Sequence, residues 1–400
     1  MMSALDRTVD KLGEGEILTL DSGETIFKLS SFKNNPIITP QNQGVTWIEN
    51  GELKIGAVFN GGAEILQDDK IISMPRCPQR YQKRKVFDKM LGMKITILEN
   101  YISEIWPLIS EDGVNFTRFQ KWSLRGDGVD HHDFLFGIED IRIIRYQQNY
   151  LLIGCGRIKP PFKDDIYGDG DRTAIYSTDN FDQIVYHGII TPFWARNTIP
   201  FPELITGQQY CLLRFFPNIY LVVLEGGIDQ LLNPTQYKDE WERIYQQRER
   251  NLLLKAGKFL HERERIGPGP QVVKTETGWL FIYHATGEIN INVGKVYGLR
   301  EKVERAYSIC VALLDLENPR KILCRVKYPI YVPSFPYELY GNELFPVDIP
   351  AVVFPTGAIV RKDKLLLYAG AGDKYMILLS CKLDNLIDYL WKYCKINEEL

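Results

Sequence analysis

Five short β-hairpins recur along this chain, each made of two strand-like runs that are joined by a turn of polar residues and glycine. The best defined covers residues 140–154 and begins directly after Gly137-Ile138-Glu139. The others occupy residues 57–74, 201–215, 271–284 and 352–370. Short β-rich runs bounded by Gly, Asn and Asp are typical of strands and tight turns. The chain is therefore predicted to be all-β.

The hairpins return at intervals of about 60 to 80 residues, with further strands between them at residues 174–177 and 309–314. A sheet unit that repeats along a chain is typical of a β-propeller blade, although most blades are shorter, at about 40 to 50 residues. We therefore predict a single domain, residues 1–400, that folds as a five-bladed β-propeller. A pair of β-sandwiches is the structural alternative.

Two segments break the β pattern. Residues 237–265 are rich in Glu, Arg, Lys and Gln with apolar positions among them, which predicts a helical insertion between blades. It could be a solvated excursion, a lid over the pocket or an oligomer contact. Residues 385–396 are predicted to form a short amphipathic C-terminal helix on the outside of the propeller.

Charge and cysteine content limit the partners and the compartment. A net charge of −3 and a pI near 6.1 give no reason to expect nucleic acid or an anionic membrane as a partner. The seven cysteines are scattered and contain no C-x-x-C pair, which argues against disulfides or a zinc site and favours free thiols. With no signal peptide and no apolar run of membrane-spanning length, we expect a cytoplasmic protein without a metal. The sequence is compatible with a homo-oligomer and does not decide the oligomeric state.

A propeller gathers the first residues of its innermost strands around a central axis, so side chains far apart in sequence can meet there. Taken singly, the candidates have ordinary explanations, since Asp140 could cap a turn and His284 could be a core residue. Their equivalent places at hairpin ends favour a shared pocket. The candidates are Asn60, Arg76, Asp140, Arg142, Arg196, Arg214, His284 and Asp373.

A set of spaced motifs makes a family resemblance specific. The motifs follow one another as Phe59-Asn60-Gly61-Gly62-Ala63, Gly137-Ile138-Glu139-Asp140-Ile141-Arg142, Ile266-Gly267-Pro268-Gly269-Pro270, Gly278-Trp279-Leu280-Phe281-Ile282-Tyr283-His284, Leu313-Leu314-Asp315-Leu316-Glu317-Asn318-Pro319 and Val352-Val353-Phe354-Pro355-Thr356-Gly357. Together they resemble glycoside hydrolase family 130, the β-mannoside phosphorylases and related mannosidases. The resemblance covers about residues 34 to 382.

The resemblance implies a five-bladed propeller with its site in the axial funnel, and it implies roles for individual residues. Asp140 matches the family's general acid, which acts through the mannosyl 3-hydroxyl. The matched sugar-binding positions are Asn60, Arg76 and Asp373, and we place Arg142 with them. The matched phosphate-binding positions are Arg196, Arg214, His284 and Tyr307.

A physical argument separates the family's two activities. Inverting hydrolysis needs a second carboxylate, roughly 6.5 to 9.5 Å from the acid, to activate water. Phosphorolysis needs instead a cationic cradle, because phosphate is itself the nucleophile. The candidate arginines favour inverting phosphorolysis of a β-linked mannoside to α-mannose 1-phosphate, with inorganic phosphate as co-substrate and no cofactor. The alternatives are a β-mannosidase, for which Glu139, Glu203 or Glu338 could be the base, and a propeller that only binds carbohydrate.

Some positions depart from the family pattern. Ile141 stands where the family usually has proline, which affects the aim of Asp140, and Gly61 and the segment Ala369-Gly370-Ala371-Gly372-Asp373-Lys374 also differ. These changes leave open the choice of aglycone and, to a lesser degree, the choice of glycone. His131-His132-Asp133 could line the acceptor side or form an ordinary polar loop.

Overall fold

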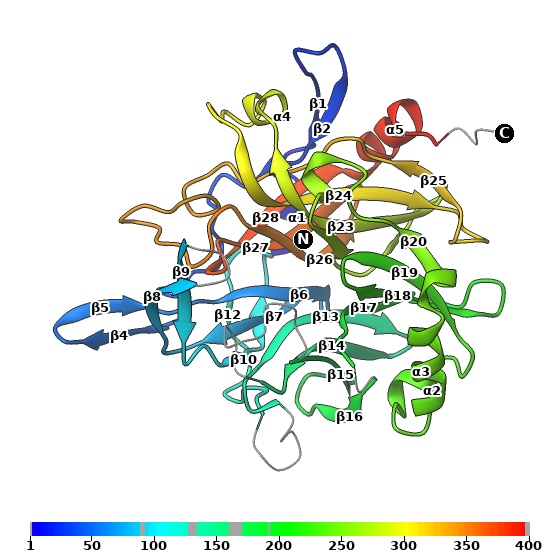
Figure 1. Cartoon of the computed structure of the whole chain (residues 1–400), viewed down its shortest axis with the longest axis horizontal. Helices are drawn as coiled ribbons and strands as arrows, with labels where there is room; N and C mark the ends of the chain where they lie inside the picture. Colours follow the sequence, from blue (N-terminus) through cyan, green and yellow to red (C-terminus); the bar gives the residue numbers. More distant parts are fainter. Residues whose placement is uncertain (1, 89–92, 127–133, 160–169, 191–192, 397–400) are drawn as a thin grey trace.

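Five small β-sheets surround one axis in the computed structural model, which describes residues 2–88, 93–126, 134–159, 170–190 and 193–396 (Figure 1). Successive sheets follow the chain from β6 to β28, so each is one blade. The predicted five-bladed β-propeller is confirmed.

Each blade is an antiparallel sheet of four or five strands. Blade 1 holds β6 (Phe59–Ile65), β7 (Ile71–Pro78), β10 (Ser103–Ile105), β11 (Leu108–Ser110) and β12 (Thr117–Arg118). Blade 2 holds β13 (Ile138–Tyr146), β14 (Asn149–Arg157), β15 (Asp171–Thr178) and β16 (Val185–Ile189). Blade 3 holds β17 (Arg196–Pro200), β18 (Gln209–Phe215), β19 (Asn218–Leu224) and β20 (Leu252–Leu254). Blade 4 holds β21 (Arg265–Pro268), β22 (Val273–Lys274), β23 (Trp279–Ile289), β24 (Val303–Leu314) and β25 (Ile322–Arg325). Blade 5 holds β26 (Val353–Arg361), β27 (Lys364–Ala371), β28 (Tyr375–Lys382) and β3 (Ser30–Ser31).

The ring closes in two places. Around the axis, the inner strand β6 contacts both β13 of the next blade and β26 of the last blade. At the outside, the N-terminal strand β3 pairs with β28, with Ser31 opposite Leu379. Blade 5 is thus built from both ends of the chain, which ties the first residues of the propeller to its last.

Apolar side chains on both faces of the sheets fill the space between blades. The largest buried cluster joins blades 3, 4 and 5, and it includes Trp279, Tyr283 and Leu313. A strand buried on both faces reads as a nearly continuous apolar run, as Trp279–Tyr283 does. This packing fixes the inner strands whose ends form the site.

Three predicted hairpins match the structure and two need correction. The strand predicted at residues 201–205 lies instead at β17, because Pro202 lacks the N–H group that a ladder needs. In blade 4 the predicted strand at residues 271–274 shortens to β22, and the other half of β23 pairs with β21. The turn residues Thr206 and Gly207 are in the left-handed region, as a tight turn requires.

Helices are few. They are α1 (Ala4–Val9), α2 (Asp229–Leu232), α3 (Lys238–Gln246), α4 (Ile291–Lys295) and α5 (Leu383–Tyr393), with 3₁₀ turns at Arg248–Asn251 and Leu260–Glu262. The predicted insertion is helical at α3, but it lies within blade 3, between β19 and β20, rather than between blades, and its later part forms the outer strand β20 and the first residue of β21. The C-terminal helix is confirmed as α5, which begins two residues earlier than predicted and packs against β28, β2 and β25. Within the described chain, no helix has the length and apolar character of a membrane span.

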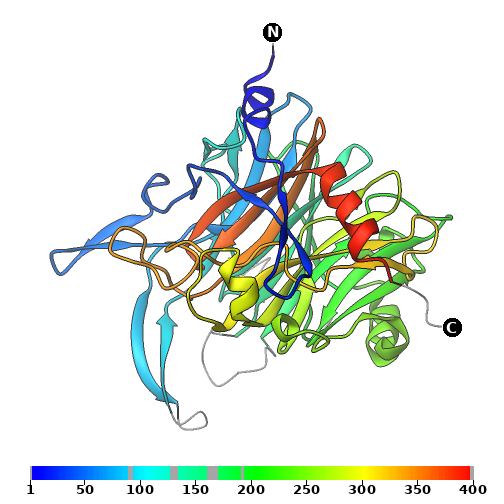
Figure 2. The ribbon, with the colours of Figure 1, turned by 90° about the horizontal axis from the view of Figure 1, so that it is seen from above.

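Three hairpins stand outside the blades: β1 (Glu16–Thr19) with β2 (Thr25–Lys28), β4 (Thr46–Glu49) with β5 (Glu52–Ile55), and β8 (Gln82–Asp88) with β9 (Met93–Glu99). In the view from above, β4–β5 and β8–β9 extend away from the disc of blades (Figure 2). The β8–β9 hairpin matters for function, because Leu98 and the nearby Tyr101 line the central cavity.

Candidate active site

Irregularities in the inner strands aim side chains at the axis. The pairing register shifts between Phe59 and Gly62 in β6, between Glu139 and Arg142 in β13, between Arg196 and Ile199 in β17, and between Pro355 and Gly357 in β26. In the first three, the residue in the shift has a positive φ: 53° at Asn60, 55° at Asp140 and 54° at Asn197. A bulge re-aims its side chains, and backbone strain of this kind concentrates at functional sites.

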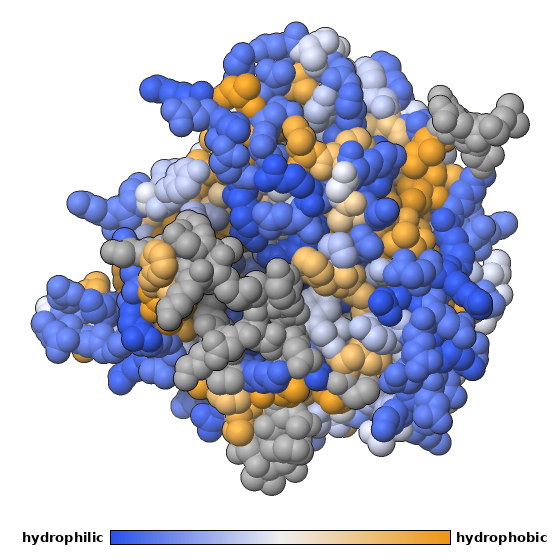
Figure 3. All heavy atoms as spheres, in the orientation of Figure 1, coloured by the Kyte–Doolittle hydropathy of each residue, from blue (hydrophilic) through white to orange (hydrophobic). Residues whose placement is uncertain are grey.

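The bulges open onto a cavity of about 350 Å³, a size typical of a small-molecule site. Seven of the nine predicted site residues line it: Asn60, Arg76, Asp140, Arg196, Arg214, Tyr307 and Asp373. Glu139, which the sequence analysis names only as a possible hydrolytic base, also lines it. The remaining lining residues, which the sequence did not single out for this pocket, are Leu98, Tyr101, Arg157, Arg265, Arg305, Ile349, Val352 and Phe354. The face seen in Figure 3 is mostly hydrophilic, with its apolar residues in separate groups.

Asp140 is nearly fully buried among cationic groups. Its Oδ1 accepts hydrogen bonds from Asn60 Nδ2 at 3.0 Å and Arg76 Nη1 at 3.5 Å, and its Oδ2 accepts one from Arg196 Nη2 at 3.1 Å. Burial raises the pKa of Asp140, but Arg196, Arg76 and Arg142 outweigh it and hold the pKa below its usual value. The carboxyl group is therefore ionised when the site contains only these groups.

Glu139, one residue earlier on the same strand, braces two of these arginines. Arg76 Nη2 donates to its Oε1 at 2.5 Å, and Arg196 Nη2 donates to its Oε2 at 2.6 Å. Arg76 is held from the other side by Ser103 Oγ, at 3.1 Å from Nε and 2.9 Å from Nη2. The bulge lets consecutive carboxyl groups face one cavity, and both arginines are fixed before any ligand arrives.

None of the three glutamates considered as a hydrolytic base is well placed. Arg196 Nη2 contacts both Glu139 and Asp140, so those carboxyl oxygens are closer together than the roughly 6.5 Å that an intervening water needs. Glu203 is exposed and pairs with Lys274. Glu338 is buried outside the cavity wall, where it accepts hydrogen bonds from Tyr331 Oη at 2.8 Å and the Ser334 amide at 2.7 Å.

Asp373 lies in the turn between β27 and β28 with a φ of 50°. Burial raises its pKa to about 7; Arg76 lowers it, and the nearby carboxylates of Asp140 and Asp348 raise it. The next residue, Lys374, donates to Asp348 Oδ1 at 3.0 Å and to Tyr81 Oη at 2.9 Å. This buried network fixes the turn that presents Asp373 to the cavity.

Two predicted residues lie behind the wall. Arg142 is 1% exposed, and its guanidinium donates to the backbone oxygens of Gly269 at 3.0 Å and Asp140 at 2.6 Å. His284 is fully buried beside Gly267 and Arg214. Burial lowers the pKa of His284 well below its usual value, and Arg214 acts in the same direction, so the imidazole is neutral rather than part of a cationic cradle. Direct ligand contacts of Arg142 and His284 stay predictions.

Arginines give an excess of positive charge to the part of the cavity wall that is formed by β17, β18, β21 and β24. Arg196 and Arg214 are direct partners in the β17–β18 register. Arg265 donates to Tyr307 Oη, and the guanidinium carbons of Arg265 and Arg305 lie 5.3 and 5.4 Å from the Tyr307 ring centre. Burial raises the pKa of Tyr307, but these arginines outweigh it and lower the pKa. Burial, then Arg265 and Arg196, lower the pKa of Arg214 to about 9.

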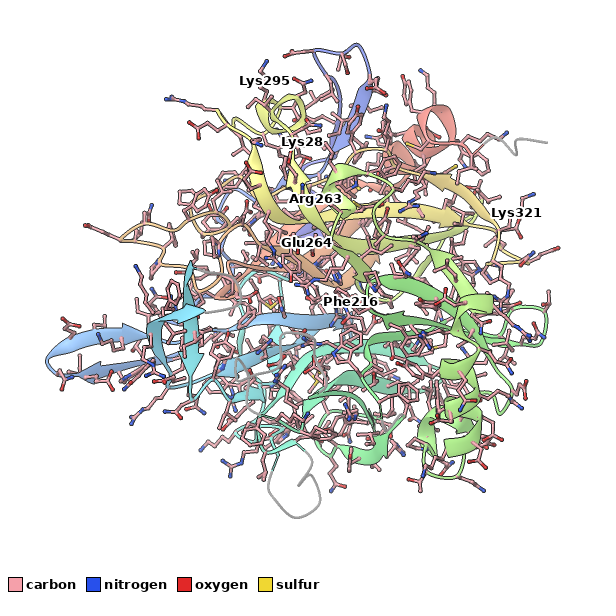
Figure 4. All side chains as sticks on the ribbon, in the orientation of Figure 1. Lys28, Phe216, Arg263, Glu264, Lys295 and Lys321 are labelled. Carbon is pink, nitrogen blue, oxygen red and sulfur yellow. The ribbon has the colours of Figure 1, made fainter. Side chains whose placement is uncertain are left out.

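Most of the arginines that line the cavity already have carboxylate partners. Arg157 pairs with Asp171 at 2.6 Å, and Arg305 pairs with Glu264 at 3.0 Å near the centre of the face, where Figure 4 labels Glu264. Within the described residues, neither Arg214 nor Arg265 has a carboxylate at ion-pair distance, and the Nε atom of each is buried without a hydrogen-bond partner. These two free cations match the charge of a phosphate dianion.

Arg265 had a usable sequence signal, because it directly precedes the Ile266-Gly267-Pro268 motif. Glu139 likewise stands beside the predicted acid. Arg157 and Arg305 carry no such signal. His131-His132-Asp133 lie outside the described residues.

One buried cluster outside the cavity has metal-ligand chemistry. Donor atoms of His261, Glu262 and Cys310 lie within 4.8 Å of one another. Arg325 Nη2 donates to both oxygens of Glu262 at 2.7 Å, and Tyr283 Oη donates to Oε1 at 2.9 Å. The guanidinium already supplies the positive charge that Glu262 needs, so this cluster is a structural ion pair.

Comparison with known proteins connects this geometry to a family. A sequence model of glycoside hydrolase family 130, described as β-1,4-mannooligosaccharide phosphorylase, matches residues 39–392. This chain belongs to glycoside hydrolase family 130. The match covers every lining residue of the cavity and every blade strand except β3.

Curated β-mannoside phosphorylases align along most of the chain. A β-1,2-mannobiose phosphorylase from Listeria innocua is 29% identical and covers 90% of this chain and 97% of its own length. A 1,2-β-oligomannan phosphorylase from Thermoanaerobacter sp. is 26% identical and covers 76% of this chain and 92% of its own. The solved β-1,2-mannobiose phosphorylase of Listeria innocua has a TM-score of 0.64 at 23% identity, covers 90% of this chain and 99% of its own, and shares the fold.

Proposed function

We propose that this protein is an inverting β-mannoside phosphorylase that transfers a mannosyl group from a β-linked manno-oligosaccharide to inorganic phosphate. The observation that carries the proposal is the pair Arg214 and Arg265, which have no carboxylate partner in the described part of the chain and lie in the same cavity as Asp140. A water nucleophile needs no such cations, whereas a phosphate dianion needs them.

The geometry supports a division of the cavity. Asn60, Arg76 and Asp373 offer hydrogen-bonding groups to the hydroxyls of a mannosyl ring on the side of β6, β7 and the β27–β28 turn. Arg196, Arg214 and Arg265, with the Tyr307 hydroxyl, receive phosphate on the side of β17, β18 and β21. Phosphate then attacks the anomeric carbon as the Asp140 proton moves, through the mannosyl 3-hydroxyl, to the leaving oxygen. The product is α-mannose 1-phosphate.

The linkage is proposed from the relatives. Three curated relatives that span most of this chain are named for β-1,2-linked mannosides, whereas the family model is described by a β-1,4-linked one. We propose β-1,2-mannobiose or a longer β-1,2-oligomannan as the substrate, with inorganic phosphate as co-substrate and no other cofactor. A cytoplasmic location is also proposed, because all seven cysteines are buried and free.

The test is to incubate the protein with β-1,2- and β-1,4-mannobiose, each with and without phosphate, and to quantify mannose 1-phosphate and free mannose separately. Phosphate-dependent mannose 1-phosphate supports the proposal, and the better substrate assigns the linkage. Free mannose released regardless of phosphate would make the protein a mannosidase. Sugar binding without either product would leave a carbohydrate-binding propeller. The Asp140→Asn variant should bind both ligands and lose most turnover.

A further inference from the structure

Asp140, the proposed acid, lies beside positive charges that favour the loss of its proton. A general acid must be protonated when the leaving group departs. Arg76 Nη1 and Arg196 Nη2 both contact the Asp140 carboxylate, at 3.5 and 3.1 Å, and a nearby opposite charge favours the ionised form of a carboxyl group. The question of how Asp140 gains a proton rests on the proposed function.

Charged groups face Asp140 from every element packed around it. Cations come from Arg76 on β7, Arg142 on β13 and Arg196 on β17, and Asn60 on β6 donates a neutral hydrogen bond. Negative charge comes from Glu139 on β13 and from Asp373 in the β27–β28 turn. Arg76 and Arg196 contact the carboxylate directly, so the balance at Asp140 favours the ionised form until more negative charge enters the cavity.

Arg196 connects the acid to the phosphate side. Its Nη2 is shared between Glu139 and Asp140, its Nη1 lies 3.5 Å from Asp171, and its Nε is buried without a hydrogen-bond partner. Arg214 is its direct partner across the β17–β18 ladder. An anion that binds between Arg196 and Arg214 therefore weakens the field of the guanidinium that holds Asp140 ionised, and adds negative charge close to it.

We propose that phosphate binding at Arg196 and Arg214 drives uptake of one proton by Asp140, so that the acid becomes competent only when the nucleophile is present. Arg196 is the positioning residue that couples the two events. Without phosphate the ionised acid cannot assist departure of the leaving group, which suppresses attack by water.

The protons balance over a turnover. One proton from solvent converts the Asp140 carboxylate to the acid as hydrogen phosphate dianion binds. During reaction a phosphate oxygen bonds to the anomeric carbon, the bond from that carbon to the leaving oxygen breaks, and the Asp140 proton ends on the leaving oxygen. The proton that phosphate carried is lost to solvent from mannose 1-phosphate. Uptake and release cancel, and Asp140 returns to its ionised form.

Sulfate is the most direct probe, because it is a dianion of the same shape that carries no proton near neutral pH. Titrating sulfate into the protein by calorimetry, in buffers of different ionisation enthalpy, counts protons taken up by the protein itself. We expect uptake of nearly one proton, and sulfate affinity that falls by up to about tenfold per pH unit between about pH 6 and pH 8. The pH range ends at about pH 8 because Arg214 has a pKa of about 9 and begins to lose its positive charge above that range.

Two variants locate the proton. In Asp140→Asn, proton uptake and the pH dependence of sulfate affinity should fall to the smaller share that Asp373, with a pKa of about 7, can contribute, whereas Asp373→Asn should keep most of the uptake. No uptake in the unaltered protein would overturn the inference, and so would uptake that stays undiminished in Asp140→Asn or disappears in Asp373→Asn. Thermal unfolding of each variant with and without sulfate checks that the site is folded.

Failure of the proton coupling can be distinguished from failure of the proposed phosphorylase function. If mannose 1-phosphate forms but sulfate binds without proton uptake, only the coupling fails. If neither mannose 1-phosphate nor anion binding is found, the phosphorylase proposal fails as well.

Discussion

Gly370 offers a sharp test of how the sugar side of the cavity is built. It lies on β27, and a Cβ atom added there would be 1.9 Å from Oδ1 of Asn60. The φ of Gly370 lies outside the left-handed region, so Gly370→Ala introduces a steric change without backbone strain. Asn60 in turn donates to Asp140 at 3.0 Å. The substitution therefore acts on the acid through one identified side chain.

The size of the effect follows from these distances. Ordinary contact needs about 3.4 Å, so the Asn60 amide oxygen must move by roughly 1.5 Å. A shift of that size breaks the hydrogen bond to Asp140, and the lost bond and local overpacking should lower the free energy of unfolding by about 1 to 3 kcal/mol. A misplacement of about 1 Å in an active site costs on the order of a hundredfold in rate. We expect kcat/KM for the mannoside to fall by about that factor.

The assay is initial-rate kinetics at varied mannoside and varied phosphate, with urea unfolding measured in parallel. Gly278→Ala is the matched control, because a Cβ there would meet Leu313 Cγ at 2.6 Å, and Gly278 does not line the cavity. It should lose stability and keep the kcat/KM of the folded protein. If Gly370→Ala were destabilised but kept kcat/KM within about twofold, the position of Asn60 would not control the acid.

Three further predictions concern other parts of the structure. Arg265→Gln should raise the KM for phosphate by about 10- to 150-fold, which is the value of a charge-assisted hydrogen bond. Arg305→Gln should raise this KM less, because Arg305 is half exposed and already paired with Glu264. Equal effects of the two substitutions would contradict the assignment of Arg265 to phosphate binding. Burial raises the pKa of Glu338 to about 7, so the free energy of unfolding should fall by about 3 kcal/mol between about pH 4.5 and pH 7, and Glu338→Gln should remove that slope in pH-dependent urea unfolding. Arg325→Met should leave Glu262 buried without its cation and cost about 3 to 5 kcal/mol in the same assay, with unchanged KM values; a smaller cost would mean that water replaces the guanidinium.

The sequence was sufficient to predict the blades wherever a tight turn separated two apolar runs, as in residues 352–370. It failed where proline interrupted the ladder. Pro202 moved a strand to Arg196–Pro200, and the charged segment that begins near Tyr237 hid the outer strand Leu252–Leu254. Neither change is visible in local periodicity, because both depend on which neighbouring strand supplies the hydrogen bonds.

The candidate site, like the blades, could be predicted only in part. Residues at the starts of inner strands, such as Asn60 and Asp140, could be predicted to meet at the axis. Whether a given side chain reaches the cavity depends on bulges and on backbone partners, which the sequence does not record. Arg142 illustrates this, because its guanidinium is taken up by the carbonyls of Gly269 and Asp140. Arg305 illustrates the reverse, since it joins the cavity from a strand beyond the one that carries His284.

The charges of the cavity also explain why one scaffold can favour phosphate over water. Six arginines and three carboxyl groups line the wall in the described residues. Glu139 is committed to Arg76 and Arg196, and Asp140 to the same two arginines, so neither is available to remove a proton from water. A carboxylate that is ion-paired in this way is a weaker base, because its charged form is stabilised. The arginine contacts that hold Glu139 and Asp140 therefore keep these two groups from acting as the base for hydrolysis. Arg214 and Arg265, which have no carboxylate partner among the described residues, favour the dianion. Selection of the nucleophile follows from which cations have partners and which do not.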